Sequence, residues 1–167
     1  ASIMVTANRI EWNRQGGVLI NGSNSMQFTG CSIDHNFGPG IKITNGTSHT
    51  VTGCKVRSNG VDHTDDNSSQ IWIENCKGVS VTGNSIWGWF GRKEWDFQTP
   101  SPYYGIIAKN LAGSVISNNA MYHASSKVGV DDRGGHIGTF IGQNMYVKPQ
   151  IEMKEDGGFR LLDSTGF

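Results

Sequence analysis

A short motif recurs through the chain and constrains the fold more than any other feature. The pattern Thr-Gly-Cys-x-aliphatic occurs at residues 29–33 and 52–56, and Thr-Gly-Asn-Ser-Ile follows at 82–86. Three looser copies lie at residues 6–10, 117–121 and 141–145. Self-similarity at intervals of a few tens of residues is the signature of a stacked repeat architecture.

Aligning the copies on the glycine-like residue, here called the repeat origin, brings apolar residues into register. The repeat origins are residues 7, 30, 53, 83, 118 and 142. Two residues before the origin lie Val5, Phe28, Val51, Val81, Ile116 and Phe140. Three residues after it lie Ile10, Ile33, Val56, Ile86, Met121 and Met145. Twelve and ten residues before it lie Val18 and Ile20, Ile41 and Ile43, Ile71 and Ile73, and Ile106 and Ala108. We therefore expect each copy to be one coil of short strands, with alternate side chains inside and about six coils sharing one core.

Polar residues also align between copies. One residue after the origin lie Asn8, Cys31, Cys54, Asn84, Asn119 and Gln143, and eight residues before it lie Gly22, Asn45, Asn75 and Asn110. Asparagine tolerates the backbone angles of sharp bends and can hydrogen-bond to its copies above and below, which predicts asparagine ladders. Cys31 and Cys54 share a buried column with no basic residue beside them, so we interpret them as inert core thiols.

Composition narrows the possible partners. The chain has 14 Lys and Arg against 14 Asp and Glu, and this balance disfavours binding to nucleic acid or to an anionic membrane surface. Its 23 glycines disfavour a helical bundle, and no apolar run is long enough to span a membrane. We expect no cofactor and no metal, since neither zinc nor EF-hand spacing is present.

The phrases Gly-Val-Leu-Ile-Asn-Gly, Gly-Ile-Lys-Ile-Thr-Asn-Gly and Val-Ser-Val-Thr-Gly-Asn-Ser-Ile resemble the right-handed parallel β-helix of the pectate-lyase-like superfamily. Bacteriophage tailspikes are the most similar members of that superfamily. The resemblance implies an all-β solenoid over residues 1–145, and because the chain begins within a coil we expect the solenoid to continue on its N-terminal side. Residues 146–167 alternate apolar and polar around Asp156-Gly157-Gly158, which predicts a β-hairpin that caps the open end of the solenoid.

Loop lengths indicate where a binding site lies. Between the last aliphatic column of one coil and the first of the next, the connections hold 7, 7, 14, 19 and 8 residues. All insertion therefore falls at one turn, and insertions on one face of a repeat protein commonly build its site. Seven aromatic residues lie in the longest connection, which suits the apolar faces of sugar rings, although such rings can also serve only to fold the loop.

Hydrolysis of a glycosidic bond needs a proton donor and a second carboxylate. The candidate catalytic residues, all in the two long connections, are Asp62, Asp65, Asp66, Glu94 and Asp96. The candidate substrate-binding residues are His63, Trp87, Trp89, Arg92, Trp95, Tyr103, Tyr104 and an exposed Trp72. A solvated acidic turn without chemistry is the alternative for each carboxylate.

Other coils carry polar groups at equivalent positions. Asp34-His35-Asn36 and Tyr122-His123 are expected to extend the binding groove formed at the two long connections. Asp131 and Arg133 are expected to pair with each other. The function predicted from the residues and the resemblance is binding and hydrolysis of a bacterial surface polysaccharide, either O-antigen or capsule. The resemblance further implies a homotrimer located in the virion or outside the cell. A non-catalytic receptor-binding shaft and a polysaccharide lyase remain as alternatives.

Overall fold

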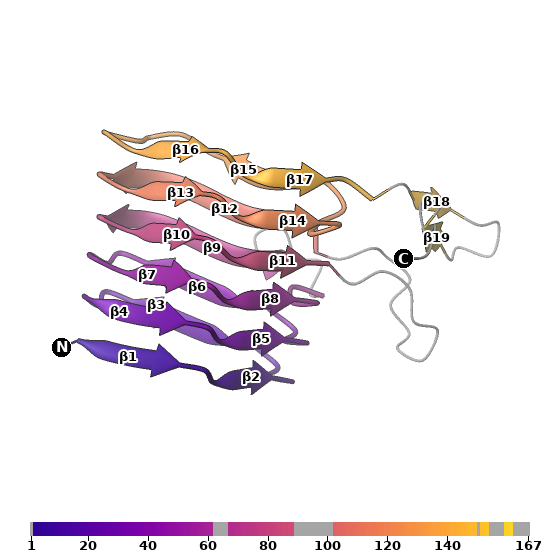
Figure 1. Cartoon of the computed structure of the whole chain (residues 1–167), viewed down its shortest axis with the longest axis horizontal. Helices are drawn as coiled ribbons and strands as arrows, with labels where there is room; N and C mark the ends of the chain where they lie inside the picture. The colour runs from indigo at the N-terminus through magenta and orange to yellow at the C-terminus, as the bar shows by residue number, and fades with distance from the viewer. Residues whose placement is uncertain (1, 62–66, 89–101, 150, 154–158, 162–167) are drawn as a thin grey trace.

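The computed structural model describes residues 2–61, 67–88, 102–149, 151–153 and 159–161. The chain winds through successive rungs, and each of the first five rungs adds one strand to each of three parallel sheets, while the last described rung adds one to sheets A and B only (Figure 1). Sheet A contains β1 (Ile3–Thr6), β4 (Met26–Thr29), β7 (Thr50–Thr52), β10 (Ser80–Thr82), β13 (Val115–Ser117) and β16 (Phe140–Gly142). Sheet B contains β2 (Arg9–Glu11), β5 (Ser32–Asp34), β8 (Lys55–Arg57), β11 (Ser85–Trp87), β14 (Ala120–Tyr122) and β17 (Met145–Val147). Sheet C contains β3 (Val18–Asn21), β6 (Ile41–Thr44), β9 (Ser69–Lys77), β12 (Tyr104–Ala112) and β15 (Val128–Asp132).

The predicted apolar columns form the core. Phe28, Val51, Val81 and Ile116 pair in register along sheet A, and each is at most 2% exposed. The columns on sheets B and C are equally buried in the middle rungs, so the three sheets enclose one continuous interior. Because a single coil cannot bury its inward face alone, this stacking supplies the hydrophobic stabilisation of every rung. The predicted parallel β-helix is confirmed.

The predicted register of the sixth copy is wrong by one residue. Ile141 pairs with Ile116 and Tyr146 pairs with Met121, so these two side chains pack against the core. Phe140 and Met145, which the alignment placed inside, are 50% and 74% exposed. The physical reason is the two-residue period of a strand, because a slip of one residue exchanges its inner and outer faces.

Each corner of the solenoid uses left-handed backbone. The repeat origins have positive φ on all rungs, and on the sixth rung the origin is Gln143 rather than residue 142. The φ values are 52° at Ala7, 62° at Gly30, 61° at Gly53, 65° at Gly83, 55° at Asn118 and 52° at Gln143. Glycine and asparagine adopt this region at low cost, which explains why they mark the repeat.

Asparagine ladders follow the corners, as predicted. Inside, Asn84 donates to Asn119 and Asn119 donates to Asn144, each at 2.9 Å between Nδ2 and Oδ1. Asn144 takes the place that the alignment gave to Gln143. Outside, a second ladder links Asn21, Asn45, Asn75 and Asn110. A third ladder, which the alignment missed, links Asn13, Asn36, Asn59 and Gln70.

The cysteines are core residues. Cys31, Cys54 and Cys76 are buried free thiols, and each Sγ lies within hydrogen-bonding distance of backbone carbonyl oxygens. Burial raises the pKa of the Cys54 and Cys76 thiols, which keeps them protonated and unreactive at neutral pH.

The C-terminal segment contains the predicted hairpin. β18 (Ile151–Met153) pairs antiparallel with β19 (Phe159–Leu161). In Figure 1 the hairpin lies beside the solenoid, past the end of β17, and not over the edge formed by β16. The described residues contain no helix that is long and apolar enough to cross a membrane.

Candidate functional site

The seam is the edge where the chain passes from sheet B to sheet C on successive rungs. The long connections after β8 and β11 both leave sheet B there and return to sheet C as β9 and β12, which confirms the predicted single edge of insertion. Most of the predicted site residues fall outside the described residues: Asp62, His63, Asp65, Asp66, Trp89, Arg92, Glu94, Trp95 and Asp96. The described part of the site is therefore built from the residues that flank these connections.

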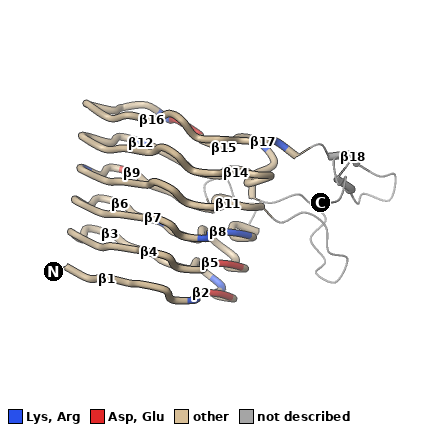
Figure 2. The backbone as a smooth tube through the Cα atoms, in the orientation of Figure 1, with Lys and Arg blue, Asp and Glu red and all other residues tan. Residues whose placement is uncertain are grey.

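One column of outward side chains lines the seam at the ends of the sheet B strands. In this seam column Glu11, Asp34, Arg57 and Trp87 pair in register from rung to rung, and Tyr122 and Val147 pair with each other on the last two rungs. Figure 2 shows acidic residues at the ends of β2 and β5 and basic residues at β8. The first three rungs of the seam are thus charged, the next two carry the aromatic residues Trp87 and Tyr122, and the last carries Val147.

Asp34 is the centre of the charged half. Its carboxylate is buried and accepts hydrogen bonds from Ser32 Oγ at 3.3 Å and Arg57 Nε at 3.2 Å, while His35 Nδ1 lies 3.3 Å away. Burial pushes the pKa of Asp34 upward, but the hydrogen bonds with His35 and Arg57 and the positive charge of Arg57 outweigh it, and the pKa lies below its ordinary value. Asp34 is therefore ionised, and its carboxylate holds Ser32, His35 and Arg57 in place.

Glu11, Asp34 and His35 place three ligand-type atoms within 4.8 Å of one another. Arg9 lies 2.7 Å from Glu11 Oε2, and Arg57 pairs with Asp34. These two guanidinium groups balance the two carboxylates, which leaves little net negative charge to hold a divalent cation. We assign this cluster as an ion-pair network that fixes the lower seam.

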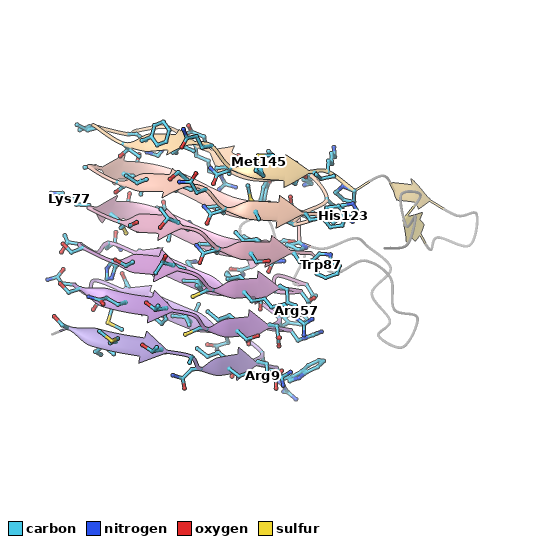
Figure 3. All side chains as sticks on the ribbon, viewed as in Figure 1. Arg9, Arg57, Lys77, Trp87, His123 and Met145 are labelled. Carbon is cyan, nitrogen blue, oxygen red and sulfur yellow. The ribbon has the colours of Figure 1, made fainter. Side chains whose placement is uncertain are left out.

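The aromatic half presents stacked rings to solvent. The Trp87 and Tyr122 rings meet edge to face with centroids 6.5 Å apart, and Tyr122 stacks on His123 at 3.9 Å. A second stacked pair, Trp12 on His35 with ring centroids 4.6 Å apart, lies in the charged half, directly after Glu11 and Asp34 in the chain. Trp12, Trp87 and Tyr122 are each about half exposed, at 53%, 49% and 47%. Figure 3 shows Arg57, Trp87 and His123 on successive rungs at this end of the solenoid.

The third asparagine ladder holds the seam from behind. Asn36 donates to Asn59 at 2.8 Å, and Asn59 donates to Gln70 at 2.9 Å between side-chain atoms. Gln70 Nε2 in turn donates to the carbonyl oxygen of Trp87. Because Asn36, Asn59 and Gln70 are fully buried, this chain of hydrogen bonds fixes the turns that carry the rings.

Tyr103 and Tyr104 lie where the longest connection rejoins sheet C. Their rings meet edge to face at 6.4 Å, and Lys127 Nζ lies 3.7 Å from the Tyr103 centroid. Arg133 Nε contacts Asp131 at 2.7 Å, which confirms the predicted pair. Tyr103 and Tyr104 therefore add two aromatic rings on the sheet C side of the seam.

The prediction that Trp72 is exposed is wrong. Trp72 points outward from β9, but it is only 8% exposed, and Lys42 Nζ lies 3.4 Å from its ring centroid. An outward position in a strand predicts exposure only where neighbouring side chains leave the residue open. The lysine on the rung below covers this ring.

The residues that flank the seam were predicted only in part. Asp34, His35, Tyr122 and His123 were expected to extend the groove, but Glu11, Arg57 and Trp12 were not singled out. All three occupy positions four or five residues after a repeat origin, as do Asp34, His35, Trp87, Tyr122 and His123. Extending the alignment to these two columns identifies the seam from the sequence.

The family model described as a right handed beta helix region matches residues 1–134. The chain belongs to this right-handed β-helix family. No curated protein and no solved structure matches the chain. Membership of this family agrees with the three parallel sheets of the solenoid and identifies the fold rather than a particular reaction.

Proposed function

We propose that this β-helix protein binds a bacterial surface polysaccharide along the seam, in the manner of a phage tailspike. The observation that carries the proposal is the half-exposed Trp87 and Tyr122 pair, on neighbouring rungs of one rigid edge. Aromatic faces accept the apolar C–H faces of sugar rings, and the polar groups beside them serve the hydroxyls. The β-helix family is compatible with polysaccharide-binding and polysaccharide-active proteins in general.

The rings are held in place before a ligand arrives. Trp87 is tied through its backbone to Gln70, and Tyr122 rests on His123. Binding therefore costs little ordering of the protein, and this lowers the entropic cost of holding a flexible sugar chain. A solenoid edge also offers equivalent positions on successive rungs, which matches a polymer better than a single small molecule.

We further propose that the bound polysaccharide is hydrolysed. Asp34 is unsuited to this reaction, since it is buried and its low pKa prevents it from acting as a general acid. The candidates remain Asp62, Asp65, Asp66, Glu94 and Asp96, which belong to the two longest connections of the seam. A homotrimer on the surface of a virion is part of the same proposal.

Binding is tested by screening the purified protein against O-antigens and capsules and then measuring affinity calorimetrically for the best ligand. We expect Trp87→Ala and Tyr122→Ala each to weaken binding about tenfold, the equivalent of about 1.4 kcal/mol. Thr52→Ala, on the outer face of sheet A, is the matched control and should bind as the wild type does. Unchanged affinity in both aromatic variants would remove the seam from the proposal.

Cleavage is tested separately on the same ligand by following its chain length. We expect hydrolysis to be lost when the five candidate carboxylates are replaced by alanine, while binding persists. An unsaturated uronate product would instead identify a lyase, because elimination leaves a double bond that hydrolysis does not. Binding without any cleavage would identify a receptor-binding segment.

A further inference from the structure

The last described rung leaves one end of the solenoid open. β16 and β17 are the final strands of sheets A and B, and among the described residues each pairs with only one neighbouring strand (Figure 1). Phe140 and Met145 donate their backbone N–H groups to the fifth rung, so the backbone groups of Ile141 and Tyr146 face away from it. We call residues 139–147 the terminal edge.

The terminal edge lacks the features that protect most exposed strand edges. Residues 139–147 contain no charged residue and no proline, whereas β2 in the first rung carries Arg9 and Glu11. Phe140, Met145 (labelled in Figure 3) and Val147 are 50%, 74% and 50% exposed. Charges, proline or a covering segment normally keep an edge from pairing with another chain. The terminal edge is therefore suited to strand addition.

Asn144 ends the inner asparagine ladder with donors that have no acceptor among the described residues. On the rungs below, the backbone N–H and the Nδ2 of one asparagine converge on the Oδ1 of the next. Asn84 donates to Asn119 in this way at 3.1 and 2.9 Å, and Asn119 donates to Asn144 at 3.2 and 2.9 Å. Asn144 Nδ2 donates to the Ile116 carbonyl oxygen at 3.0 Å. Its backbone N–H and its second amide hydrogen lie where the next oxygen of the ladder would be accepted, so the terminal edge presents two converging donors.

Tyr146 limits where a partner can bind. Its hydroxyl donates to the Ser125 carbonyl oxygen at 3.1 Å, and a Cβ atom on Gly129 of β15 would lie 2.6 Å from a carbon of its ring. The ring therefore packs against β15 and covers the interior on the sheet C side. The part of this end that remains for a partner lies above β16 and β17.

The shape of this end argues against a second copy of the chain as the partner. Among the described strands, sheet C ends at β15, one rung before sheets A and B. A copy that stacked its first rung here would place β3 two rungs above β15 and leave a gap in sheet C. Two terminal edges that faced each other would oppose the donors of both Asn144 side chains. A single extended segment above β16 and β17 meets neither difficulty.

We propose that the terminal edge binds an extended segment of a partner polypeptide, which adds a parallel strand to β16 and β17. The segment carries an apolar residue above Ile141, a side-chain amide above Asn144 and an apolar residue above Tyr146. This spacing is the one that Ile116, Asn119 and Met121 show on the rung below. Backbone hydrogen bonds supply the affinity, and the side-chain pattern supplies the specificity. The inference concerns the end of the solenoid and does not depend on a polysaccharide at the seam.

The test uses a synthetic peptide and amide NMR spectra of the complete chain. The peptide copies residues 114–123 and has the sequence SVISNNAMYH, which contains Ile116, Asn119 and Met121 at the required spacing. We expect it to shift the amide signals of Ile141, Asn144 and Tyr146. A matched peptide with Asn119→Ala should bind about fivefold more weakly, the effect of one lost hydrogen bond.

Variants of the chain separate the terminal edge from the rest of the surface. Asn144→Asp keeps an acceptor for Asn119 but replaces the outward donor by a carboxylate oxygen, so peptide affinity should fall about fivefold or more. Asn110→Asp makes the same change in the outer ladder and should have no effect. Met145→Lys adds a charge at an exposed position of the edge and should weaken the peptide without disturbing the core.

Several results would overturn the proposal. They are the absence of binding, equal binding of the two peptides, and shifts confined to β1, β2 or the seam. Self-association of the chain that Met145→Lys abolishes would make a second copy the occupant. Nuclear Overhauser contacts between the terminal edge and residues 151–161 in the free chain would show that the chain's own hairpin covers it.

Discussion

The inside of the solenoid and its seam follow opposite rules. Along sheet A the interior column passes through Val51, Val81 and Ile116, so rung after rung carries a β-branched aliphatic residue. The seam column changes from Asp34 to Arg57 to Trp87 over the same rungs. Interior positions repeat because each rung leaves the same space to fill, whereas seam positions have no such constraint. Residues of the seam column can therefore change from rung to rung without disturbing the shared core.

The largest effect that separates the two regions is expected from a cavity in a middle rung. Ile71 is fully buried in β9, between Ile41 and Ile106. Ile71→Ala should destabilise the protein by about 2–5 kcal/mol, because it removes buried methyl groups from a close-packed column. Urea denaturation measures the change.

Leu19→Ala, on the exposed face of the same sheet, is the control and should alter the free energy of unfolding by less than about 0.5 kcal/mol. Similar losses in the two variants would mean that the rungs are not held together by their common interior.

The sequence alone predicts the interior well and its last rung poorly. The columns through Phe28 and Val51 are correct because a strand that buries one face must repeat apolar residues in register. Near the sixth origin, Phe140 and Ile141 are both apolar, as are Met145 and Tyr146, so either register satisfies the pattern. Pairing with the fifth rung decides between them, and the sequence does not contain that contact.

A second test compares two ladders that look alike in the sequence. Asn119 is fully buried and its Oδ1 accepts from both the backbone N–H and the side chain of Asn84. Asn119→Ala should cost about 1–3 kcal/mol, because it leaves a buried donor without a partner.

Asn75 occupies the exposed ladder, where water replaces the lost amide. Asn75→Ala should cost less than about 1 kcal/mol in the same thermal or urea denaturation. Equal losses of stability in Asn119→Ala and Asn75→Ala would show that burial does not determine how much a ladder asparagine contributes to stability.

The position of the seam could be predicted from the sequence, but the contacts between its side chains could not. Insertion lengths identify the edge, and the longest connection begins at Trp87, whose side chain is 49% exposed. The burial of Trp72 under Lys42 depends on side chains from two rungs, which periodicity does not describe. The ion pairs of Asp34 likewise require rungs that are separated in the sequence to lie next to each other.

The ion-pair network predicts an acid dependence that the hydrocarbon interior lacks. The pKa of Asp34 is lowered in the folded state, so its contribution to stability is complete above the ordinary pKa and is lost as the pH falls through the folded pKa. Asp34→Asn should cost about 1–2 kcal/mol at pH 7, and the cost should shrink between about pH 5 and pH 2. Denaturation curves at several pH values, with Thr52→Ala on the outer face of sheet A as the uncharged control outside the network, measure it. A cost that stays constant with pH would contradict the assigned network.

The smallest effect concerns a column in which different residues accept the same kind of backbone hydrogen bond on different rungs. His49 Nδ1 accepts the Met26 N–H at 3.2 Å, as Ser114 Oγ accepts that of Val79 at 3.0 Å. His49 is fully buried, and burial lowers its pKa, so the folded protein keeps it neutral while the unfolded chain protonates below about pH 6.5. Between pH 7 and pH 5.5 the free energy of unfolding of the wild type should therefore fall by up to about 1 kcal/mol more than that of His49→Gln. Ser114→Ala removes the same type of acceptor without a titrating group, so its cost should be independent of pH in this range. If the free energy of unfolding of His49→Gln falls as much as that of the wild type, protonation of His49 does not contribute to the pH dependence of folding.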